Sequence, residues 1–399
     1  MKQILVLNSG SSSIKYELFD MNRMHVLESG LLECIGEPES CYQRKSAGRT
    51  HSDRIPVAIP NHEYGMQLIR ESLGQNESFC NGDFLVGIGH RVVHGGELFS
   101  GPTRIDEDVI ESIRRLIPLA PLHNPANLLG IEISRLAFPN VQQVAVFDTA
   151  FHQTLPRHAY HYAIPREYYQ RYQIRRYGFH GTSHHYVTRQ VADALNMPLS
   201  ELNIIVFHLG NGASAAAIRA GKSIDTSMGL TPLEGLVMGT RSGDLDPAVV
   251  FYLGSEAGLS LDQIDTLLNK QSGLKGICGV NDMREVLRRT QTGDDLACLA
   301  IDLFCYRIKK YLGGYYAVLG RLDAIAFTAG IGENVPQIRQ QSCQGLAHIG
   351  IELDAQRNES SGPGIREIQS STSAVKVFVV PTNEELEIAQ QTLQTVAAD

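Results

Sequence analysis

The chain has 399 residues, of which 43% are hydrophobic and 20% are charged. This length exceeds what one hydrophobic core usually organises, so we expect two domains. The formal net charge of −8 argues against sequence-independent binding to nucleic acid, which needs a basic surface. No apolar run approaches the length that crosses a bilayer, and the first apolar block, Ile4–Leu7, is too short for a signal peptide. We therefore expect a cytoplasmic protein without membrane or nucleic-acid partners.

Apolar strands alternate with helical patterns along the whole chain, which predicts an α/β fold. Strands are expected at Ile4–Leu7, Ile14–Phe19, Leu85–Gly89, Val141–Phe147, Asn203–Leu209, Ala213–Arg219, Ala324–Thr328 and Val375–Val380. Helices are expected at Asn61–Leu73, Asp106–Ile117, Asn124–Ala137, Thr182–Leu195, Asp246–Ala257, Leu261–Asn269, Asp294–Leu319, Pro336–Leu346 and Glu384–Val396. Asp106, Thr182 and Asp294 are residue types that start helices.

A strand, a small-residue turn and a second strand occur twice, around Asn8–Lys15 and around His208–Gly212. Hydroxyl groups, exposed backbone N–H groups and a lysine suit such turns to phosphate binding. The repeat predicts two duplicated α/β domains whose loops face each other across a ligand's phosphates. A third turn, at 324–334, has the strand and the glycines without a following strand, and we expect it to lie against the rest of a nucleotide.

The domain boundary is expected near Asp148, where a strand ends and a polar segment begins. Pro381 and Thr382 offer a bend from which the last helix can return to the first domain. The predicted domains are therefore residues 1–148 with 385–399, and residues 149–384.

Three glycine-rich loops concentrate charged side chains. Arg91 and Arg241 each lie between glycines, where they could clamp a phosphoryl group, although a surface ion pair is the alternative for Arg91. His180 and His184 have the spacing of a helical metal pair without the glutamate of an HExxH motif. A donor role for one histidine at an anion site fits better than zinc.

Two carboxylates stand at candidate functional positions. Asp148 follows a strand end, where α/β sheets place functional groups, although it could be only a loop cap. Glu384 could be only a first-turn acid of a helix, but it is also a candidate Mg²⁺ ligand, since Mg²⁺ usually takes one or two carboxylates.

The motifs, taken in their order along the chain, resemble those of the acetate kinase (acetokinase) family, within the sugar kinase, Hsp70 and actin superfold. The resemblance covers nearly the whole chain through Asn8–Lys15, His90–Gly96, Ala120–Pro125, Val146–His152, the His180 segment, His208–Gly212, Thr231–Gly235 and Pro381–Glu385. It implies two duplicated ribonuclease H-like domains with an interdomain active-site cleft. The first is an N-terminal α/β domain, and the second binds the nucleotide and joins a homodimer.

The resemblance also implies a reaction, the reversible in-line transfer of the ATP γ-phosphoryl group to acetate, which gives acetyl phosphate and ADP. Mg²⁺, or Mn²⁺ in its place, would be held by Asn8 and Glu384. The catalytic residues would be Asp148, His180, Arg241 and Arg91, and the acyl substrate would contact Arg91, Val93, Leu122, Phe179 and Pro232. The nucleotide would contact Lys15, His208, Leu209, Gly210, Asn211, Gly212, Asp282, Met283, Arg284, Gly330, Ile331, Gly332, Glu333 and Asn334.

Physical chemistry modifies the role of Asp148. A carboxylic acid with a pKa of roughly 4–5 is already ionised at neutral pH and needs no base, so we expect Asp148 to orient Arg91 or the metal's waters.

Ala329 stands where the family commonly has glycine, and its methyl group would cost on the order of 1 kcal/mol if φ is positive there. The segment before Asp282 is one residue shorter than is usual in the family.

Two alternatives stay open at this point. A propionate kinase, or a broader short-chain acyl kinase, differs from an acetate kinase only in the volume of its acyl pocket, and the β-branched Val93 favours the shorter acid. A nucleotide-dependent binding module of the actin or Hsp70 kind would not need the arginine clamp of Arg91 and Arg241.

Overall fold

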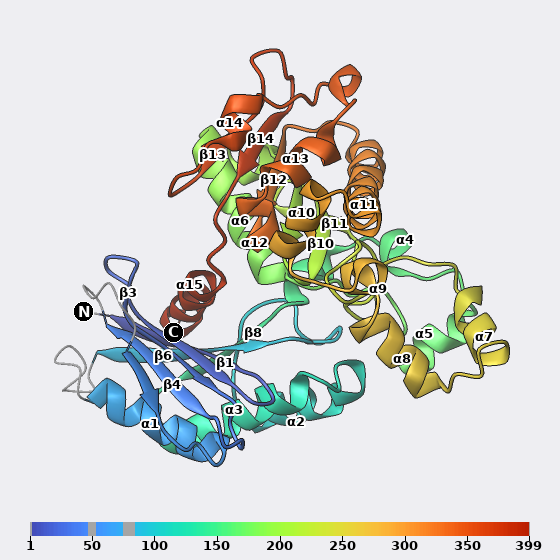
Figure 1. Cartoon of the computed structure of the whole chain (residues 1–399). Coiled ribbons are helices and arrows are strands. Elements are labelled where there is room, and N and C mark those ends of the chain that lie inside the picture. The colour runs from blue at the N-terminus through green and yellow to red at the C-terminus, as the bar shows by residue number, and fades with distance from the viewer. Residues whose placement is uncertain (1, 47–52, 75–83, 399) are drawn as a thin grey trace. The chain divides into compact units, whose positions relative to one another are not determined.

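The computed structural model describes residues 2–46, 53–74 and 84–398 (Figure 1). The chain forms two compact units, Met1–Phe151 with Asn383–Asp399, and His152–Thr382. We call them the first and the second unit. The assignment of nucleotide binding and dimerisation to the second unit stays a prediction.

The first unit is built on a mixed sheet. Its strands are β1 (Gln3–Ser9), β2 (Ile14–Asp20), β3 (His25–Glu33), β4 (Cys41–Ser46), β5 (Asp53–Pro56), β6 (Leu85–Val92), β7 (Thr103–Arg104) and β8 (Gln143–Phe147). They lie in the order β5-β4-β3-β2-β1-β6-β8-β7, and β1, β6 and β8 are parallel to one another. The helices are α1 (His62–Gly74), α2 (Glu107–Arg115), α3 (Asn124–Ala137) and α15 (Glu384–Ala397).

Alternate residues of β1 bury themselves on opposite faces of this sheet, as the two-residue period of a strand requires. Leu5 and Leu7 join a cluster with α1 and α3, whereas Ile4 and Val6 join a cluster with α15. Figure 1 shows α1 and α3 on one face and α15 on the other. The last helix therefore completes the core of the first unit, as the sequence predicts.

The second unit contains a second mixed sheet. Its strands are β9 (Asn203–Leu209), β10 (Ala213–Arg219), β11 (Lys222–Thr226), β12 (Ala324–Thr328), β13 (Arg366–Glu367) and β14 (Lys376–Val379), in the order β11-β10-β9-β12-β14-β13. Its helices are α4 (Arg157–Tyr160), α5 (Arg166–Tyr172), α6 (Gly181–Leu195), α7 (Ala248–Ser255), α8 (Leu261–Lys270), α9 (Gly273–Cys278), α10 (Met283–Gln291), α11 (Asp295–Leu319), α12 (Ala329–Asn334), α13 (Pro336–Cys343) and α14 (Ala355–Glu359). Helix α6 packs against β9 and β12, and α11 packs against β9 and β10.

The predicted duplication is confirmed by the two sheets. Strands β3-β2-β1-β6-β8 of the first unit and β11-β10-β9-β12-β14 of the second follow the same order. In both, the first three strands are antiparallel neighbours and the last three are parallel. The third predicted turn leads from β12 into α12 rather than into a strand, also as expected.

Each strand and helix expected from the sequence is present within a few residues of its predicted bounds. Asp106 and Asp294 cap α2 and α11 as predicted, because their side chains accept hydrogen bonds from backbone N–H groups of the first turn. The prediction for Thr182 was wrong: α6 begins at Gly181, after His180 in a left-handed conformation (φ 55°). No helix in the described ranges is both long and apolar enough to cross a membrane.

Candidate active site

The turn between β1 and β2 carries the first predicted site residues. Asn8 and Lys15 face each other in the antiparallel ladder, and the Gly10 amide donates to the Ser13 carbonyl at 2.8 Å. Side chains of α3 and α1 contact two backbone carbonyl groups of this turn. Asn127 Nδ2 donates to the Ser9 oxygen at 2.8 Å, and His62 Nε2 lies 2.8 Å from the Gly10 oxygen.

Two asparagines of α3, which were missed from the sequence, connect this turn to the Arg91 loop. Besides its bond to Ser9, Asn127 accepts a hydrogen bond from the Val93 amide at 3.0 Å. Asn124 accepts from the His94 amide and donates to the His94 carbonyl, both at 3.1 Å. Both asparagines are buried, so these bonds are not exchanged for bonds to water. For Asn124 the signal was available in the Ala120–Pro125 motif, which places polar residues at a helix start, whereas Asn127 lies beyond that motif.

Arg91 and Asp148 form a two-point ion pair. Arg91 Nη2 lies 2.7 Å from Asp148 Oδ2, and Arg91 Nε lies 3.2 Å and 3.1 Å from the two carboxylate oxygens. The Asp148 side chain is only 2% exposed, so the alternative that Arg91 forms only a solvated ion pair on the surface does not apply. The charge of Asp148 is the main reason that the pKa of Arg91 is raised. This contact is the one expected if Asp148 orients Arg91.

Two further carboxylates of the first unit, Glu384 and Glu385, lie near this pair, and their charges also raise the pKa of Arg91. Lys15 Nζ donates to Glu385 and lies 3.5 Å from Glu17. Burial raises the pKa of the Glu384 carboxyl to about 7; the charges of Asp148 and Glu385 also raise it, and those of Arg91 and Lys15 oppose the rise. Glu384 is therefore a partly buried carboxylate whose negative charge is not fully compensated by the chain itself.

That imbalance suits a cation. A divalent metal beside Glu384 would supply the missing positive charge, and Mg²⁺ needs only one or two carboxylates because water and phosphate complete its shell. Among the described residues, no group of three or more His, Cys, Asp or Glu side chains could hold a metal. A single carboxylate whose charge is not fully compensated is the kind of protein ligand that Mg²⁺ takes. His184 is buried and hydrogen-bonded to Ser214.

The corresponding turn of the second unit is tied to the Arg241 loop. The Gly210 amide donates to the Gly212 carbonyl at 2.9 Å, which repeats the closure of the first turn. The Gly239 amide donates to the Asn211 carbonyl at 2.9 Å. A Cβ atom at Gly239 would lie 2.0 Å from Asn211 Oδ1, so a larger residue there would displace the Asn211 side chain.

Arg241 and His180 converge on this turn. A Cβ atom built on Gly212 would lie 3.4 Å from Arg241 Nη1 and 3.6 Å from His180 Nε2. Arg241 Nη1 also donates to the Pro232 carbonyl at 3.1 Å, and burial lowers its pKa. The His180 ring stacks on that of His208 at 4.1 Å between centroids. An arginine and an imidazole nitrogen thus face the same glycine.

A cavity of about 900 Å³ begins at this turn and lies within the second unit. It is lined by Gly210, Asn211, Asp282, Met283, Arg284, Gly330, Ile331 and Asn334, all predicted nucleotide contacts. Asn281, Leu287, Gln291, Val335, Pro336, Gln337 and Glu359 also line it and were missed. The other predicted contacts do not line this cavity: Lys15 in the first unit, and His208, Leu209, Gly212, Gly332 and Glu333 in the second.

The walls of this cavity are held by local contacts. Asp282 caps α10 by accepting from the Arg284 amide at 2.9 Å, and the Arg284 side chain bonds back to it, which lowers the pKa of Asp282 to about 2. Buried Arg339 donates to the carbonyls of Gly332 and Glu333 at the end of α12. Ala329 has φ 62°, so the condition under which its methyl group is costly is met.

The predicted acyl contacts are divided between the units. Val93 and Leu122 belong to the first unit, in which Leu122 is 64% exposed. Phe179 and Pro232 belong to the second, in which Phe179 is buried and its carbonyl lies 3.0 Å from His152 Nε2. A common acyl pocket for these four side chains stays a prediction.

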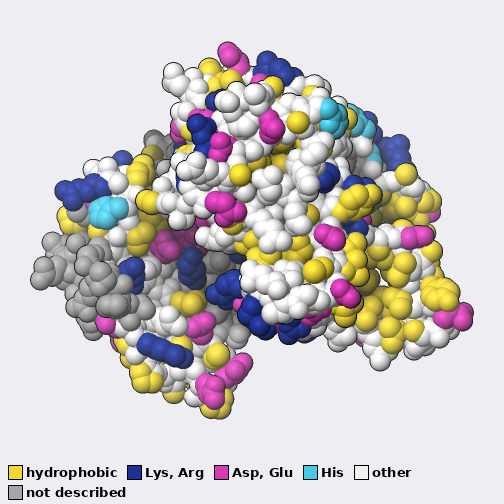
Figure 2. Space-filling model, turned by 45° about the horizontal axis from the view of Figure 1, so that its top comes forward, with side chains coloured by type: hydrophobic (Ala, Val, Ile, Leu, Met, Phe, Trp, Pro, Cys, Tyr) yellow, Lys and Arg dark blue, Asp and Glu magenta, His cyan; other side chains and the backbone are white. Residues whose placement is uncertain are grey.

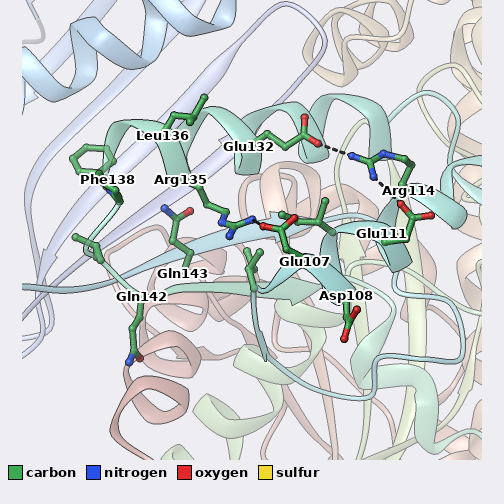
Figure 3. Close-up of a pocket in the computed structure, with 14 residues that line it drawn as sticks. Glu107, Asp108, Glu111, Arg114, Glu132, Arg135, Leu136, Phe138, Gln142 and Gln143 are labelled. Atoms are coloured by element: carbon green, nitrogen blue, oxygen red, sulfur yellow. Dashed lines mark hydrogen bonds and ion pairs between the residues drawn. The ribbon is translucent and has the colours of Figure 1, made fainter.

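A groove in the first unit contains none of the predicted site residues. It has a volume of about 890 Å³ and lies between α2, α3 and the start of β8 (Figure 3). Arg114 bridges Glu111 and Glu132 at 2.7 Å and 2.8 Å, and Arg135 pairs with Glu107 at 2.8 Å. Four carboxylates (Glu107, Asp108, Glu111 and Glu132) line the groove against these two arginines, so it stays acidic overall.

Comparisons with known proteins agree with this arrangement. A family model for the acetokinase family matches residues 3–390. The acetate kinase of Streptomyces coelicolor is 54% identical over 397 residues, which cover 99% of this chain and 97% of that relative. The acetate kinase of Syntrophobacter fumaroxidans is 52% identical over 399 residues, with 99% and 97% covered.

Two solved structures are similar over nearly their whole length. The acetate kinase of Porphyromonas gingivalis has a TM-score of 0.94 at 41% identity, with 99% of this chain and 100% of that chain covered. A propionate kinase from Francisella tularensis has a TM-score of 0.92 at 46% identity, with the same coverage. Sequence motifs, duplicated sheets and fold thus lead to one conclusion: the chain belongs to the acetokinase family.

Proposed function

We propose that this protein transfers the γ-phosphoryl group of ATP to acetate, giving acetyl phosphate and ADP, and that it catalyses the reverse reaction. The proposal depends above all on Arg241 and His180, which converge on Gly212 beside a cavity of nucleotide size. Membership of the acetokinase family makes the chain a phosphotransferase, so the alternative of a non-enzymatic binding module is set aside.

In the proposed reaction the chain supplies positive charge and alignment. Arg241 and Arg91 neutralise the oxygens of the transferring group, and His180 donates a hydrogen bond to it. Asp148 fixes the Arg91 guanidinium through its two-point contact and does not act as a base, since the acetate is already ionised. Bound Mg²⁺, or Mn²⁺, would neutralise phosphate charge, with Asn8 and Glu384 as its proposed protein ligands.

The reaction is tested by trapping acyl phosphate with hydroxylamine after incubation with ATP and Mg²⁺. Formate, acetate, propionate and butyrate are compared in parallel. We expect the highest kcat/KM with acetate and measurable activity with propionate. If no acid gives acyl hydroxamate above the background without enzyme, the proposed function is wrong.

The arginine clamp is tested by Arg91→Ala and Arg241→Ala. We expect kcat to fall by roughly 100-fold or more, because each change removes a cation that faces the transition state. The affinity for ATP, measured by calorimetry, should change little, since neither arginine lines the nucleotide cavity. Arg115→Ala, which removes a side chain that is 73% exposed, is the matched control. Unchanged turnover in either clamp variant contradicts this role.

Propionate is the second candidate substrate, because a propionate kinase is among the similar structures. One methylene group changes binding by only about 1–3 kcal/mol, so the two activities are expected to overlap. Val93→Ala should raise kcat/KM for propionate relative to acetate by making room for that group. An unchanged ratio would show that Val93 does not limit the acyl pocket.

We further propose a homodimer formed through the second unit. Exposed apolar side chains gather on α7, α8 and α11: Val249, Phe251, Tyr252, Leu261, Leu296, Leu299, Leu303 and Tyr306. Figure 2 shows hydrophobic side chains gathered at the right edge, where α7 and α8 lie in Figure 1. Apolar patches of this kind commonly mark protein interfaces.

We also propose a cytoplasmic location, since the reaction needs ATP.

A further inference from the structure

The imidazole of His180 is connected to a second buried histidine through one hydroxyl group. His180 Nδ1 lies 3.0 Å from Ser214 Oγ, and His184 Nε2 lies 2.8 Å from the same oxygen. Ser214 is fully buried on β10, and His184 is fully buried on α6. Since a serine hydroxyl has a single proton, it can donate to only one of the two rings.

The other nitrogen of His184 decides the direction of this chain. His184 Nδ1 is buried and makes no hydrogen bond with any described residue. A buried N–H group without an acceptor is disfavoured more strongly than a buried acceptor without a donor. The proton of His184 therefore belongs on Nε2, where it is donated to Ser214 Oγ.

The charge state of His184 supports this assignment. Burial lowers its pKa well below the usual value, and the neighbouring rings of His152 and His208 lower it further. His184 is thus a neutral ring with one proton. Because its Nε2–H occupies one side of the Ser214 oxygen, the hydroxyl proton is directed to His180 Nδ1.

We infer that Ser214 and His184 are positioning residues that hold His180 in the tautomer with its proton on Nε2. That nitrogen faces Gly212 beside Arg241 Nη1. In this tautomer His180 presents a donor on the side of the turn where the guanidinium also lies. The opposite tautomer would present a lone pair there, which repels a phosphoryl oxygen. The use of this donor in phosphoryl transfer rests on the proposed function, whereas the tautomer itself does not.

The tautomer is measured directly by two-bond ¹H–¹⁵N correlation spectra of the full-length protein labelled with ¹⁵N-histidine, recorded above pH 8. The His180 signals are assigned by their loss in His180→Gln. We expect Nε2 to bear the proton in the wild-type protein and a mixture of tautomers in Ser214→Ala. A proton on His180 Nδ1, in a neutral ring or an imidazolium, overturns the inference, as does an unchanged spectrum in Ser214→Ala.

Kinetics provide the second readout. Ser214→Ala and His184→Met should each lower kcat at least about tenfold, because a misplaced imidazole proton is costly in catalysis. KM for ATP should stay unchanged. His184→Gln keeps an N–H donor and should retain more activity than His184→Met. In a His180→Gln background, Ser214→Ala should cause no further loss, whereas an additive loss contradicts action through His180.

Ser223→Ala is the matched control. It also deletes a buried serine hydroxyl bonded to a histidine in the second unit, with Ser223 Oγ 2.8 Å from His152 Nδ1. It should leave kcat and the His180 signals unchanged. If wild-type protein forms no acyl phosphate, the proposed function fails while the spectra still decide the tautomer.

Discussion

Glu384 is a carboxylate of the first unit whose ionisation is disfavoured by its surroundings, above all by burial. Its pKa of about 7 in the folded chain lies above the unfolded value of 4.5. Between these two values the folded protein binds more protons than the unfolded chain, so the free energy of unfolding falls as pH rises through this interval. Above pH 7 the destabilisation is fully present.

Replacing this charge should stabilise the metal-free protein. Glu384→Gln is expected to raise the free energy of unfolding by on the order of 2 kcal/mol at pH 8 and to change it little at pH 5. Thermal or urea unfolding at the two pH values, with metal chelated, measures this. The exposed Glu39→Gln serves as the control. An equal effect of Glu384→Gln at both pH values would contradict the pKa assignment.

Ala329 carries backbone strain at the start of α12. At φ 62°, a residue with a Cβ atom destabilises the folded state by roughly 1–2 kcal/mol. Glycine removes this strain, but its greater conformational entropy in the unfolded chain offsets part of the gain. We expect Ala329→Gly to stabilise the protein by about 0.5–1 kcal/mol in urea unfolding. Ala194→Gly, at an exposed position of α6, should destabilise it instead. A loss of stability in Ala329→Gly would show that the methyl group makes compensating contacts.

At the scale of elements, the first turn of α3 holds two loops together. Asn127 bonds to the Ser9 carbonyl of the β1–β2 turn and to the Val93 amide of the Arg91 loop. The helix thus sets the distance between Asn8 and Arg91, although neither residue belongs to it.

Removing that bridge should affect both stability and turnover. Asn127→Leu leaves a buried carbonyl and a buried amide without partners, which costs about 1–3 kcal/mol. We expect kcat to fall while the affinity for ATP, measured by calorimetry, is kept, because the cavity that we propose for the nucleotide lies in the other unit. Asn140→Ala, at an exposed position, controls for the loss of an asparagine. Wild-type kcat in a folded Asn127→Leu protein would refute the bridging role.

At the scale of the whole molecule, the exposed apolar faces of α7, α8 and α11 predict self-association. Phe251 is 75% exposed and Tyr252 is 69% exposed, although both are large apolar side chains. The double variant Phe251→Asp/Tyr252→Asp should shift the protein from dimer to monomer in sedimentation velocity experiments. Leu136→Asp, at a site that is 80% exposed in the first unit, should remain dimeric. A monomeric wild-type protein would contradict the proposed interface.

Several features of this protein follow from local patterns in its amino-acid sequence. The alternation of strands and helices, the repeated strand–turn–strand units and the return of the last helix are local patterns or repeats, so they can be recognised in one dimension. The motif order identified the family for the same reason. Arg91, Asp148, His180 and Arg241 are proposed as site residues because glycines and strand ends mark them locally.

Which side chains meet, by contrast, depends on how the chain folds in three dimensions. The Asn127 bridge and the Ser214 link between His180 and His184 join residues that are far apart in the sequence. The contact of Arg339 with the end of α12 is closer in sequence, but no motif marks it. Likewise, the pKa of Glu384 depends on burial and on charges from three other segments. Hydrogen bonds and electrostatic energies depend on distance in space, which sequence spacing does not contain.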